Sequence, residues 1–331
     1  MEICMLTRRR LIPVLTLLAT AAATHCAWAQ SSAPWPTRGP IKLVAVFPPG
    51  GSVDQVARIL AAPLQAQLGQ TVIVDNKGGA SGSIGAAAVA AAPADGYTFA
   101  VVFDTHGVNP SLIPNLPFDS KKDLTPLVLV GTSPMVLATN VGSEYKTFAD
   151  VVAASKAKKN VSYGSIGSGS LGHVAMTLLG KNGGLEWTHI PYKGGGPLMN
   201  DAVAGHVPLS IGSVFVTKPH IDNKRLRPLA VTTSKRAREL PDVPTLAESG
   251  FPGFEAPAWW AVLAPAKTPP DILKRMTEEL NKALKNPDVA KKLEAQGIEV
   301  VGGSSDSARV FIDKQMDIWA KVVKDNNIKA D

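Results

Sequence analysis

Apolar runs of strand length alternate with glycine-rich turns and helical stretches in the first third of the chain. Residues 41–46, 71–75 and 97–103 have the apolar and β-branched character of buried strands. Stretches with helical character, 53–68 and 86–92, separate them. This strand–helix–strand–helix–strand order predicts a parallel sheet, in which a ligand would lie beyond the carboxyl ends of the strands.

Three loops leave strands at that edge: 47–58, 76–85 and 104–110. The first places two prolines and two glycines before Ser52 and Asp54, which are both favourable helix N-cap residues. We expect a tight turn whose unpaired N–H groups, beside the positive end of a helix dipole, suit an anion. An ordinary capped β–α turn is the alternative.

The pattern returns in the second half of the chain, where a glycine turn at 165–172 follows a strand and precedes a helix. A second glycine turn, 193–197, follows another strand. We expect a second parallel unit, a strand that crosses back and three C-terminal helices. The expected strands are 127–130, 135–138, 161–164, 188–192, 207–211, 229–232 and 258–263, and the expected helices are 147–157, 173–179, 198–204, 269–285, 288–296 and 304–324.

The first 29 residues have the features of an export signal. Three arginines, Arg8 to Arg10, precede an apolar run at 11–23, and Ala27 and Ala29 fit the small-x-small cleavage pattern. Cleavage after Ala29 would remove one glutamate and three arginines, which lowers the formal charge from +7 to +5. It would also remove both cysteines of the chain, so we expect no disulfide in the mature protein. The general and the twin-arginine export routes both fit this segment.

The remaining charge pattern indicates no nucleic-acid partner. The basic clusters at 156–159 and 235–238 contain no aromatic residues of the kind that single-strand binders interleave with charge. The sequence also lacks the motifs of a phosphate loop and of a zinc protease. We expect no metal and no cofactor.

Two motifs suggest enzymatic alternatives. Residues 167–172 read G-x-G-x-x-G between a strand and a helix, as in a dinucleotide site, but no acidic residue ends the next strand. Ser170 and His173 could pair as a nucleophile and a base, although G-x-S-x-G is absent. A cleft dehydrogenase and a cleft hydrolase are therefore alternatives to a binding function.

Aromatic and imidazole side chains could shape the ligand. His106 falls in the third strand-exit loop, where it could donate to a carboxylate. Trp259 and Trp260 are expected mainly in the core, with one able to stack on a flat substrate. Together these residues favour a ligand with an aromatic group or a second carboxylate.

Several segments, in order over nearly the whole mature length, resemble the periplasmic solute receptors of the tripartite tricarboxylate transporters, also called the Bordetella uptake gene family. The segments that carry the resemblance are 47–58, 76–85, 109–112, 163–170, 191–195, 241–245 and 263–269.

The resemblance implies an α/β, two-lobed fold like that of type II periplasmic binding proteins, with hinged lobes around a ligand cleft. Its lobes would be 30–131 plus 256–331, and 132–255, after a signal peptide of residues 1–29. It implies an exported periplasmic receptor, monomeric and not an enzyme, that delivers a small organic carboxylate to the membrane subunits of a transporter. A sensing protein that docks to a signalling receptor would share this cleft.

Carried over by position, the resemblance implies a ligand shell from both lobes. The expected ligand-binding residues are Phe47, Gly50, Gly51, Ser52, Asp54, Ser81, Thr105, His106, Ser165, Gly167, Ser168, Ser170, Gly194 and Gly195. Asp54 is acidic, so its expected role is to cap the helix, orient a water or recognise an amine. His106 and Thr177 depart from the family pattern, which often has Ala and Glu at these places. Thr105 and His106 thus point to an unusual substrate.

Overall fold

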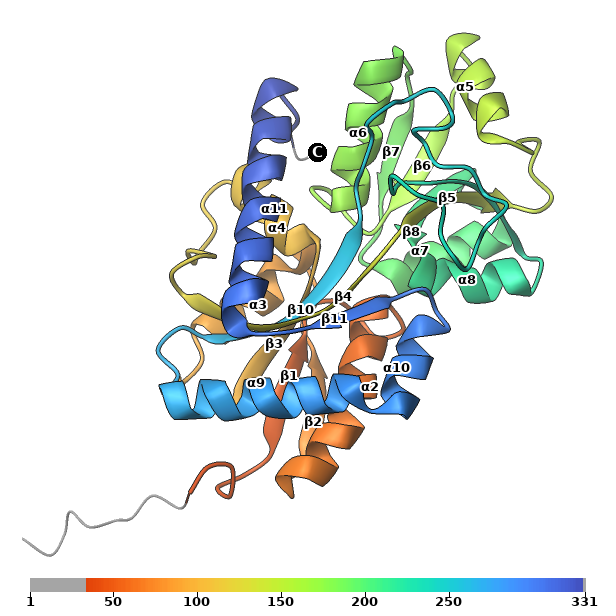
Figure 1. Ribbon diagram of the computed structural model, residues 1–331. Coiled ribbons are helices and arrows are strands. Elements are labelled where there is room, and N and C mark those ends of the chain that lie inside the picture. The colour runs from red at the N-terminus through yellow and green to blue at the C-terminus, as the bar shows by residue number, and fades with distance from the viewer. Residues whose placement is uncertain (1–33, 330–331) are drawn as a thin grey trace, which may run out of the picture. The chain divides into compact units, whose positions relative to one another are not determined.

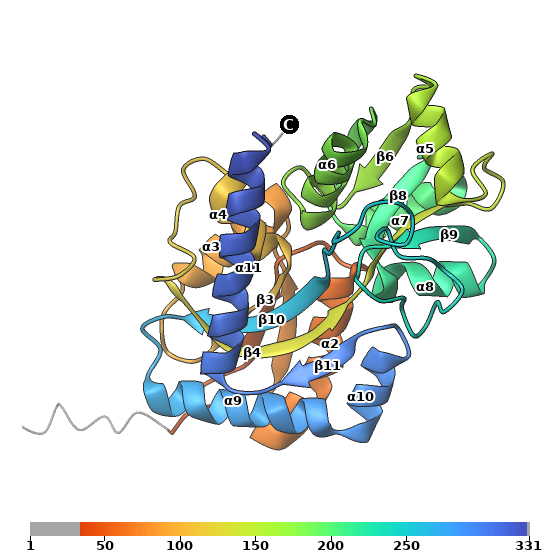
Figure 2. The same cartoon turned by 45° about the horizontal axis from the view of Figure 1, so that its top comes forward.

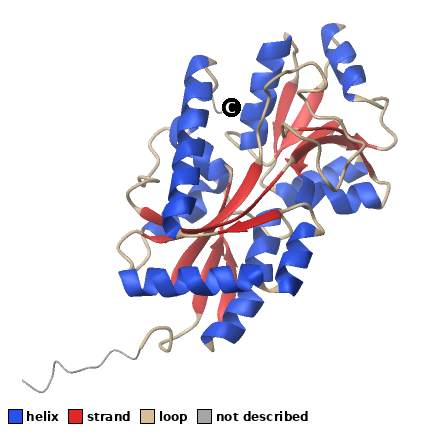
Figure 3. Cartoon of the chain, in the orientation of Figure 1, coloured by secondary structure: helices blue, strands red, loops and turns tan. Residues whose placement is uncertain are grey.

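The computed structural model describes residues 34–329 and contains two β-sheets, each flanked by helices (Figure 3). The first sheet has six strands in the order β11-β4-β10-β3-β1-β2. Its strands are β1 (Ile41–Ala45), β2 (Val72–Asn76), β3 (Thr98–Phe103), β4 (Leu124–Ser133), β10 (Ala258–Pro265) and β11 (Glu299–Gly302). β1 pairs in parallel with both β2 and β3, as predicted, whereas β10 is antiparallel to β3 and β4.

The second sheet has five strands in the order β7-β6-β8-β5-β9. They are β5 (Met135–Asn140), β6 (Ser162–Ser165), β7 (Thr188–Pro191), β8 (Leu209–Ser213) and β9 (Leu226–Val231). β6 is parallel to β7 and β8, but β5 runs antiparallel to both β8 and β9. β9 therefore runs in the same direction as β8, as predicted, but the antiparallel β5 lies between them and interrupts the predicted parallel unit.

Helices follow most of the strands (Figure 1). Those that accompany the first sheet are α2 (Ser52–Leu68), α3 (Ser83–Ala90), α4 (Thr105–Leu112), α9 (Pro270–Lys285), α10 (Pro287–Glu294) and α11 (Ser305–Asp325), with a short 3-10 helix, η1 (Ala80–Gly82). Those that accompany the second are α5 (Phe148–Lys156), α6 (Leu171–Gly183), α7 (Gly195–Ala204) and α8 (Val214–Asp222). None of the described helices is long and apolar enough to span a membrane.

Helix ends agree with simple capping rules at several places. Thr147 caps α5 in a capping box with Asp150, as expected for its position. Gly69 ends α2 in the left-handed conformation that glycine adopts at little cost. Local sequence therefore sets the ends of these two helices.

Residues 104–110, expected to form a loop, lie mostly in helix α4. Pro110 argues against a helix because it cannot donate a backbone hydrogen bond. The helix nevertheless lies beside α11 in two views (Figures 1 and 2). A Cβ added to Gly107 would lie only 3.3 Å from Trp259 Cζ2 and 3.4 Å from Gln315 Cβ. This close packing overrides the local propensity.

The chain passes between the two sheets twice, and Thr232 joins the two passages. Met135, which opens β5, donates its N–H to Thr232 Oγ1 at 3.2 Å. Thr232 Oγ1–H donates to the carbonyl of Ala256 at 2.7 Å, just before β10. The lobe boundaries that we proposed from sequence, after residues 131 and 255, fall close to this crossing and stay a prediction.

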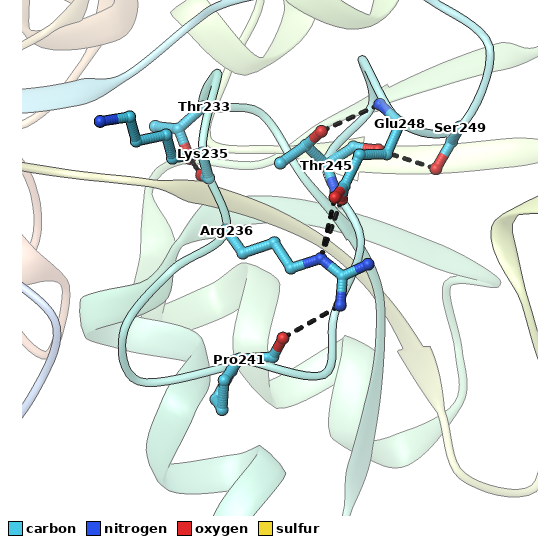
Figure 4. A network of polar contacts seen from close by, with 7 residues as sticks. All are labelled: Thr233, Lys235, Arg236, Pro241, Thr245, Glu248 and Ser249. Carbon is cyan, nitrogen blue, oxygen red and sulfur yellow. Dashed lines mark hydrogen bonds and ion pairs between the residues drawn. The ribbon is translucent and has the colours of Figure 1, made fainter.

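A long segment between β9 and β10 carries the basic cluster at 235–238. Arg236 Nε donates to both carboxylate oxygens of Glu248, at 2.9 and 3.1 Å, and its Nη1 donates to the carbonyl of Pro241 (Figure 4). The backbone N–H of Thr245 and then Arg236 lower the pKa of Glu248. The hydrogen bonds of Arg236 thus stabilise the segment between β9 and β10 to which it belongs.

Candidate functional site

The loop after β1 is built around two glycines and Asp54. Gly51 is the N-cap of α2, so the expectation that Ser52 or Asp54 fills that position was wrong. Asp54 lies in the first turn, and its Oδ2 accepts the N–H of Gly50 at 3.0 Å. Gly50 has a φ of +83°, a conformation that glycine adopts readily. A side chain inside the helix therefore holds the preceding turn in place.

Asp54 is an ionised structural group. Burial raises its pKa, but hydrogen bonds from Arg58 and from the Gly50 N–H outweigh burial, so that the pKa falls below its usual range. Arg58 Nη2 lies 2.9 Å from Asp54 Oδ1. Of its expected roles, the structure favours capping, here of the turn rather than the helix end.

The β1–α2 loop contacts the loop that opens α7 in the other sheet. A Cβ added to Gly51 would lie 3.6 Å from the nitrogen of Gly195 and 3.8 Å from that of Gly196. A Cβ added to Gly194, whose φ is +124°, would lie 3.1 Å from Pro48 Cδ. The two backbones meet where only small residues fit. The sequence-predicted residues of both loops are therefore brought together.

A second contact between the part of the chain around the first sheet and the part around the second, called here the two halves, involves Ser81. Its hydroxyl donates to the carbonyl of Ser168 at 2.5 Å. Ser81 adopts a positive φ of 50°, and its own carbonyl accepts the side-chain amide of Asn109 at 3.0 Å. A Cβ added to Gly167 would lie 2.9 Å from Ser81 Oγ. Ser81, Gly167 and Ser168 thus form a bridge between the halves.

A narrow cavity lies next to the Gly51–Gly195 contact, with room for about one water molecule. Most of its side chains are apolar and come from both halves of the chain. These are Phe47, Val53, Phe103, Met135, Ile166 and Val216. Gly51, Ser52, Gly195, Gly212 and Ser213 complete the lining. Four of the residues predicted from sequence, Phe47, Gly51, Ser52 and Gly195, therefore line it.

Three helices begin at this cavity: α2, α7 and α8. The first N–H groups of a helix have no acceptor within it, and the helix dipole adds partial positive charge there. Three N-termini that converge on one space favour a negative charge there, although the N–H of Val214, the first of α8, already donates to the carbonyl of Pro134 at 2.9 Å.

Ser213 is a functional candidate that the sequence analysis missed. It is the N-cap of α8 and is only 2 % exposed. Its hydroxyl oxygen has no hydrogen-bond partner among the residues that the structure describes. A buried hydroxyl without a partner is costly, so a ligand atom beside it would remove a penalty. The signal that could have revealed it is a serine at a strand exit, but helix α8 was not predicted.

The loop at 165–170 uses its polar groups internally. The N–H of Gly167 donates to Ser165 Oγ, and the N–H of Gly169 donates to His173 Nδ1 at 3.1 Å. Ser170 caps α6, accepts the N–H of His173 and donates to Ser165 Oγ. The N–H groups of Gly167, Gly169 and Ser170, three of those that a dinucleotide phosphate could use, are thus engaged.

The same contacts bear on the predicted nucleophile and base. The proton of Ser170 is directed to Ser165 Oγ, 3.1 Å away, and not to an imidazole. Ser165 Oγ itself lies 2.7 Å from His189 Nε2, a serine–histidine contact that the sequence did not suggest. Ser165 and Ser170 are completely buried and are not among the residues that line the cavity, so neither is placed to attack a ligand there.

Thr105 and His106 do not line the cavity either. Both are buried in α4, and the His106 ring lies nearly parallel to that of Phe118, with 6.4 Å between the ring centroids. Burial lowers the pKa of His106 to about 4, which leaves the imidazole neutral. Burial also raises the pKa of Asp104 well above its ordinary value, against a smaller opposing effect of the Thr105 N–H.

The two tryptophans belong to the core. Trp259 and Trp260 are both fully buried. Trp260 supports the cavity from behind, because its indole N–H donates to Ser52 Oγ and its ring lies 4.9 Å from that of Phe103. Neither ring lines the cavity, so neither is placed to stack on a substrate there.

The described residues contain no group of three or more His, Cys, Asp or Glu side chains that could hold a metal ion. The predicted export signal, residues 1–29, lies outside the described residues, and so do both cysteines.

Comparison with known proteins identifies the family. The pattern described as "Tripartite tricarboxylate transporter family receptor" matches residues 56–328. The protein BugT of Bordetella pertussis is 38 % identical over 298 residues, which cover 89 % of this chain and 91 % of BugT.

Solved structures give the fold. The periplasmic binding protein BugD is 31 % identical, with a TM-score of 0.84 over 88 % of this chain and 99 % of BugD. Rpa4515 of R. palustris, solved with adipate, is 35 % identical, with a TM-score of 0.85 over 89 % of this chain and 99 % of Rpa4515. The chain therefore has a two-lobed periplasmic-binding-protein-like fold and belongs to the tripartite tricarboxylate transporter receptor family.

Proposed function

We propose that this protein is a periplasmic solute receptor that captures a small organic carboxylate and delivers it to the membrane subunits of a tripartite tricarboxylate-type transporter. The observation that carries the proposal is the convergence of the α2, α7 and α8 N-termini on one cavity beside the unpartnered hydroxyl of Ser213. Family membership and the adipate of the Rpa4515 structure support it.

In this proposal the ligand binds between two lobes that hinge near Thr232. The cavity is too narrow for an organic acid while Gly51 and Gly195 are in contact, so the loops must separate for entry. A carboxylate bound by N–H groups of both lobes favours the closed arrangement, since only that arrangement brings both sets together. The Ser81–Ser168 hydrogen bond would then stabilise the closed arrangement at a second contact between the lobes.

The protein acts by binding and not by catalysis. Asp54 is committed to Gly50 and Arg58, and Ser170 to the α6 cap. Cleavage of the export signal after Ala29 and a monomeric state complete the proposal.

The proposal is tested by a thermal-shift screen of refolded mature protein against a panel of organic acids. A ligand present at a hundred times its Kd should stabilise the folded protein by about 2.7 kcal/mol, which is a visible shift of Tm. Stoichiometric binding with no product formed is the expected result. A folded protein that responds to no acid in the panel would contradict the carboxylate function.

We predict that Gly51→Ala weakens carboxylate binding about tenfold to a hundredfold while the protein still folds, at a cost of about 1 kcal/mol for alanine at the N-cap of α2. Alanine fits the backbone, since the nearest atom to its Cβ would lie 3.6 Å away. The added methyl group would cover the Gly195 and Gly196 nitrogens, and a lost hydrogen bond to a charged group costs about 1.5–3 kcal/mol.

Isothermal titration calorimetry with the acid found in the screen measures this loss. The matched control is Gly39→Ala, where an added Cβ meets no atom within 4 Å. Unchanged affinity in Gly51→Ala would place the carboxylate elsewhere.

A further inference from the structure

The lining of the cavity has no charged side chain. All eleven lining residues are apolar, glycine or serine. Asp54, which lies near the cavity in the first turn of α2, is ionised but paired with Arg58. Within this lining, positive potential for an anionic ligand therefore comes from the helix N-termini.

These N-termini converge at one place and not at two ends of a long site. Gly195 begins α7, and its added Cβ would lie 3.7 Å from Gly51 Cα in α2's cap and 3.7 Å from Val216 Cγ2 in α8. Ser213, with its unpartnered hydroxyl, precedes Val216 in the same turn. The start of α7 therefore lies against the starts of both α2 and α8.

The rest of the wall is a packed apolar surface. The rings of Phe47 and Phe103 meet edge to face, with centroids 6.2 Å apart, and Trp260 lies behind Phe103. Met135 and Ile166 face them from the other half of the chain. A second carboxylate placed against these side chains would lose its hydration without gaining a partner, which is strongly unfavourable.

We propose that the ligand of this receptor is a monocarboxylate with an apolar or aromatic body, and that Ser213 Oγ binds its carboxylate together with the N-termini of α2, α7 and α8. This inference rests on the proposed function and narrows it. It differs from the ligand of the Rpa4515 structure, since adipate is a dicarboxylate. As the lobes separate, the apolar body of the ligand would pack between Phe47 and Phe103 on one side and Met135 and Ile166 on the other.

Hexanoate and adipate form a matched pair, because they share a six-carbon chain and differ by the second carboxylate. Titration calorimetry of the refolded mature protein is expected to give at least tenfold tighter binding for hexanoate, or for benzoate, than for adipate. Equal or tighter binding of adipate would overturn the monocarboxylate inference and leave the carboxylate receptor intact. Binding of no acid by the folded protein would instead contradict the receptor function itself.

Ser213→Ala tests the role of the hydroxyl. It should weaken hexanoate or benzoate binding about fivefold or more while Tm without ligand stays the same or rises, because the lost hydroxyl had no partner. Ser210→Ala is the control: Ser210 is also buried in β8, but its hydroxyl donates to Ala138 and does not line the cavity. An unchanged affinity in Ser213→Ala, or an equal loss in Ser210→Ala, would remove Ser213 from the site.

Discussion

Replacing Trp260 by alanine is expected to lower the free energy of unfolding by about 3–5 kcal/mol, the usual cost of truncating a buried tryptophan. Trp260 lies in β10, at the centre of the first sheet, and is fully buried. Its ring contacts those of Phe103 and Phe215, with centroid distances of 4.9 and 5.9 Å. Phe103 belongs to β3 and Phe215 to α8, so one side chain supports both halves of the chain.

The measurement is urea unfolding followed by circular dichroism, since the substitution itself changes tryptophan fluorescence. Trp260→Phe keeps a ring at this position and should lose less stability, although it removes the N–H donated to Ser52. The control is Val310→Ala on α11, where the side chain is 70 % exposed and the effect should stay within about 0.5 kcal/mol. A loss below about 1 kcal/mol in Trp260→Ala would contradict the role of this ring as a support of both halves.

The same tryptophan shows which parts of the fold were predictable. The apolar run 258–263 identified β10, because an unbroken apolar segment of that length is typical of a buried strand. Its direction could not be read from that run. β10 is antiparallel to both its neighbours, and this depends on the route by which the chain returns from the second sheet.

The missed helix α8 had a local cause. Val214, Phe215, Val216 and Thr217 are residue types that favour strands, and Pro219 disfavours a helix interior. Packing of this segment against the second sheet prevails over these preferences. The strand at 207–211 was predicted, but without a helix after it Ser213 was not recognised as an N-cap residue at a strand exit.

The site residues divide by the kind of signal that pointed to them. The sequence placed Gly51 and Gly195 in glycine-rich turns that follow strands, and the structure brings these two turns into contact. The loop at 165–170 has a similar glycine pattern, but the N–H groups of its two glycines, Gly167 and Gly169, donate to Ser165 Oγ and His173 Nδ1. Whether a glycine loop offers its N–H groups to a ligand depends on side chains that local sequence does not place.

His106 should make the protein less stable in mild acid. Its pKa is about 4 in the folded protein because the ring is buried, against about 6.5 when unfolded. The unfolded chain therefore binds the proton first as the pH falls. The stabilising contribution is complete above pH 6.5, declines as the pH falls towards 4, and amounts to about 3 kcal/mol over that range.

Asp104 acts in the opposite direction. Its raised pKa means that its favourable contribution is complete below about pH 3.8 and is lost as the pH rises through the value in the folded protein. The native pH profile thus contains two opposing effects from residues two positions apart. Removing the imidazole while Asp104 is retained separates them, because the carboxyl contributes to the wild-type protein and to the variant alike.

The test is the free energy of urea unfolding at pH 7 and pH 4 for the wild-type protein and for His106→Leu. The variant should lose about 3 kcal/mol less than the wild type on acidification, whatever its stability at pH 7. Thr105→Val changes a buried, non-titrating neighbour on the same helix and should keep the wild-type pH dependence. If His106→Leu and the wild type lose stability equally, His106 is already accessible to protons in the folded protein. In that case α4 must open readily, and its buried residues would return as candidates for contact with the proposed ligand.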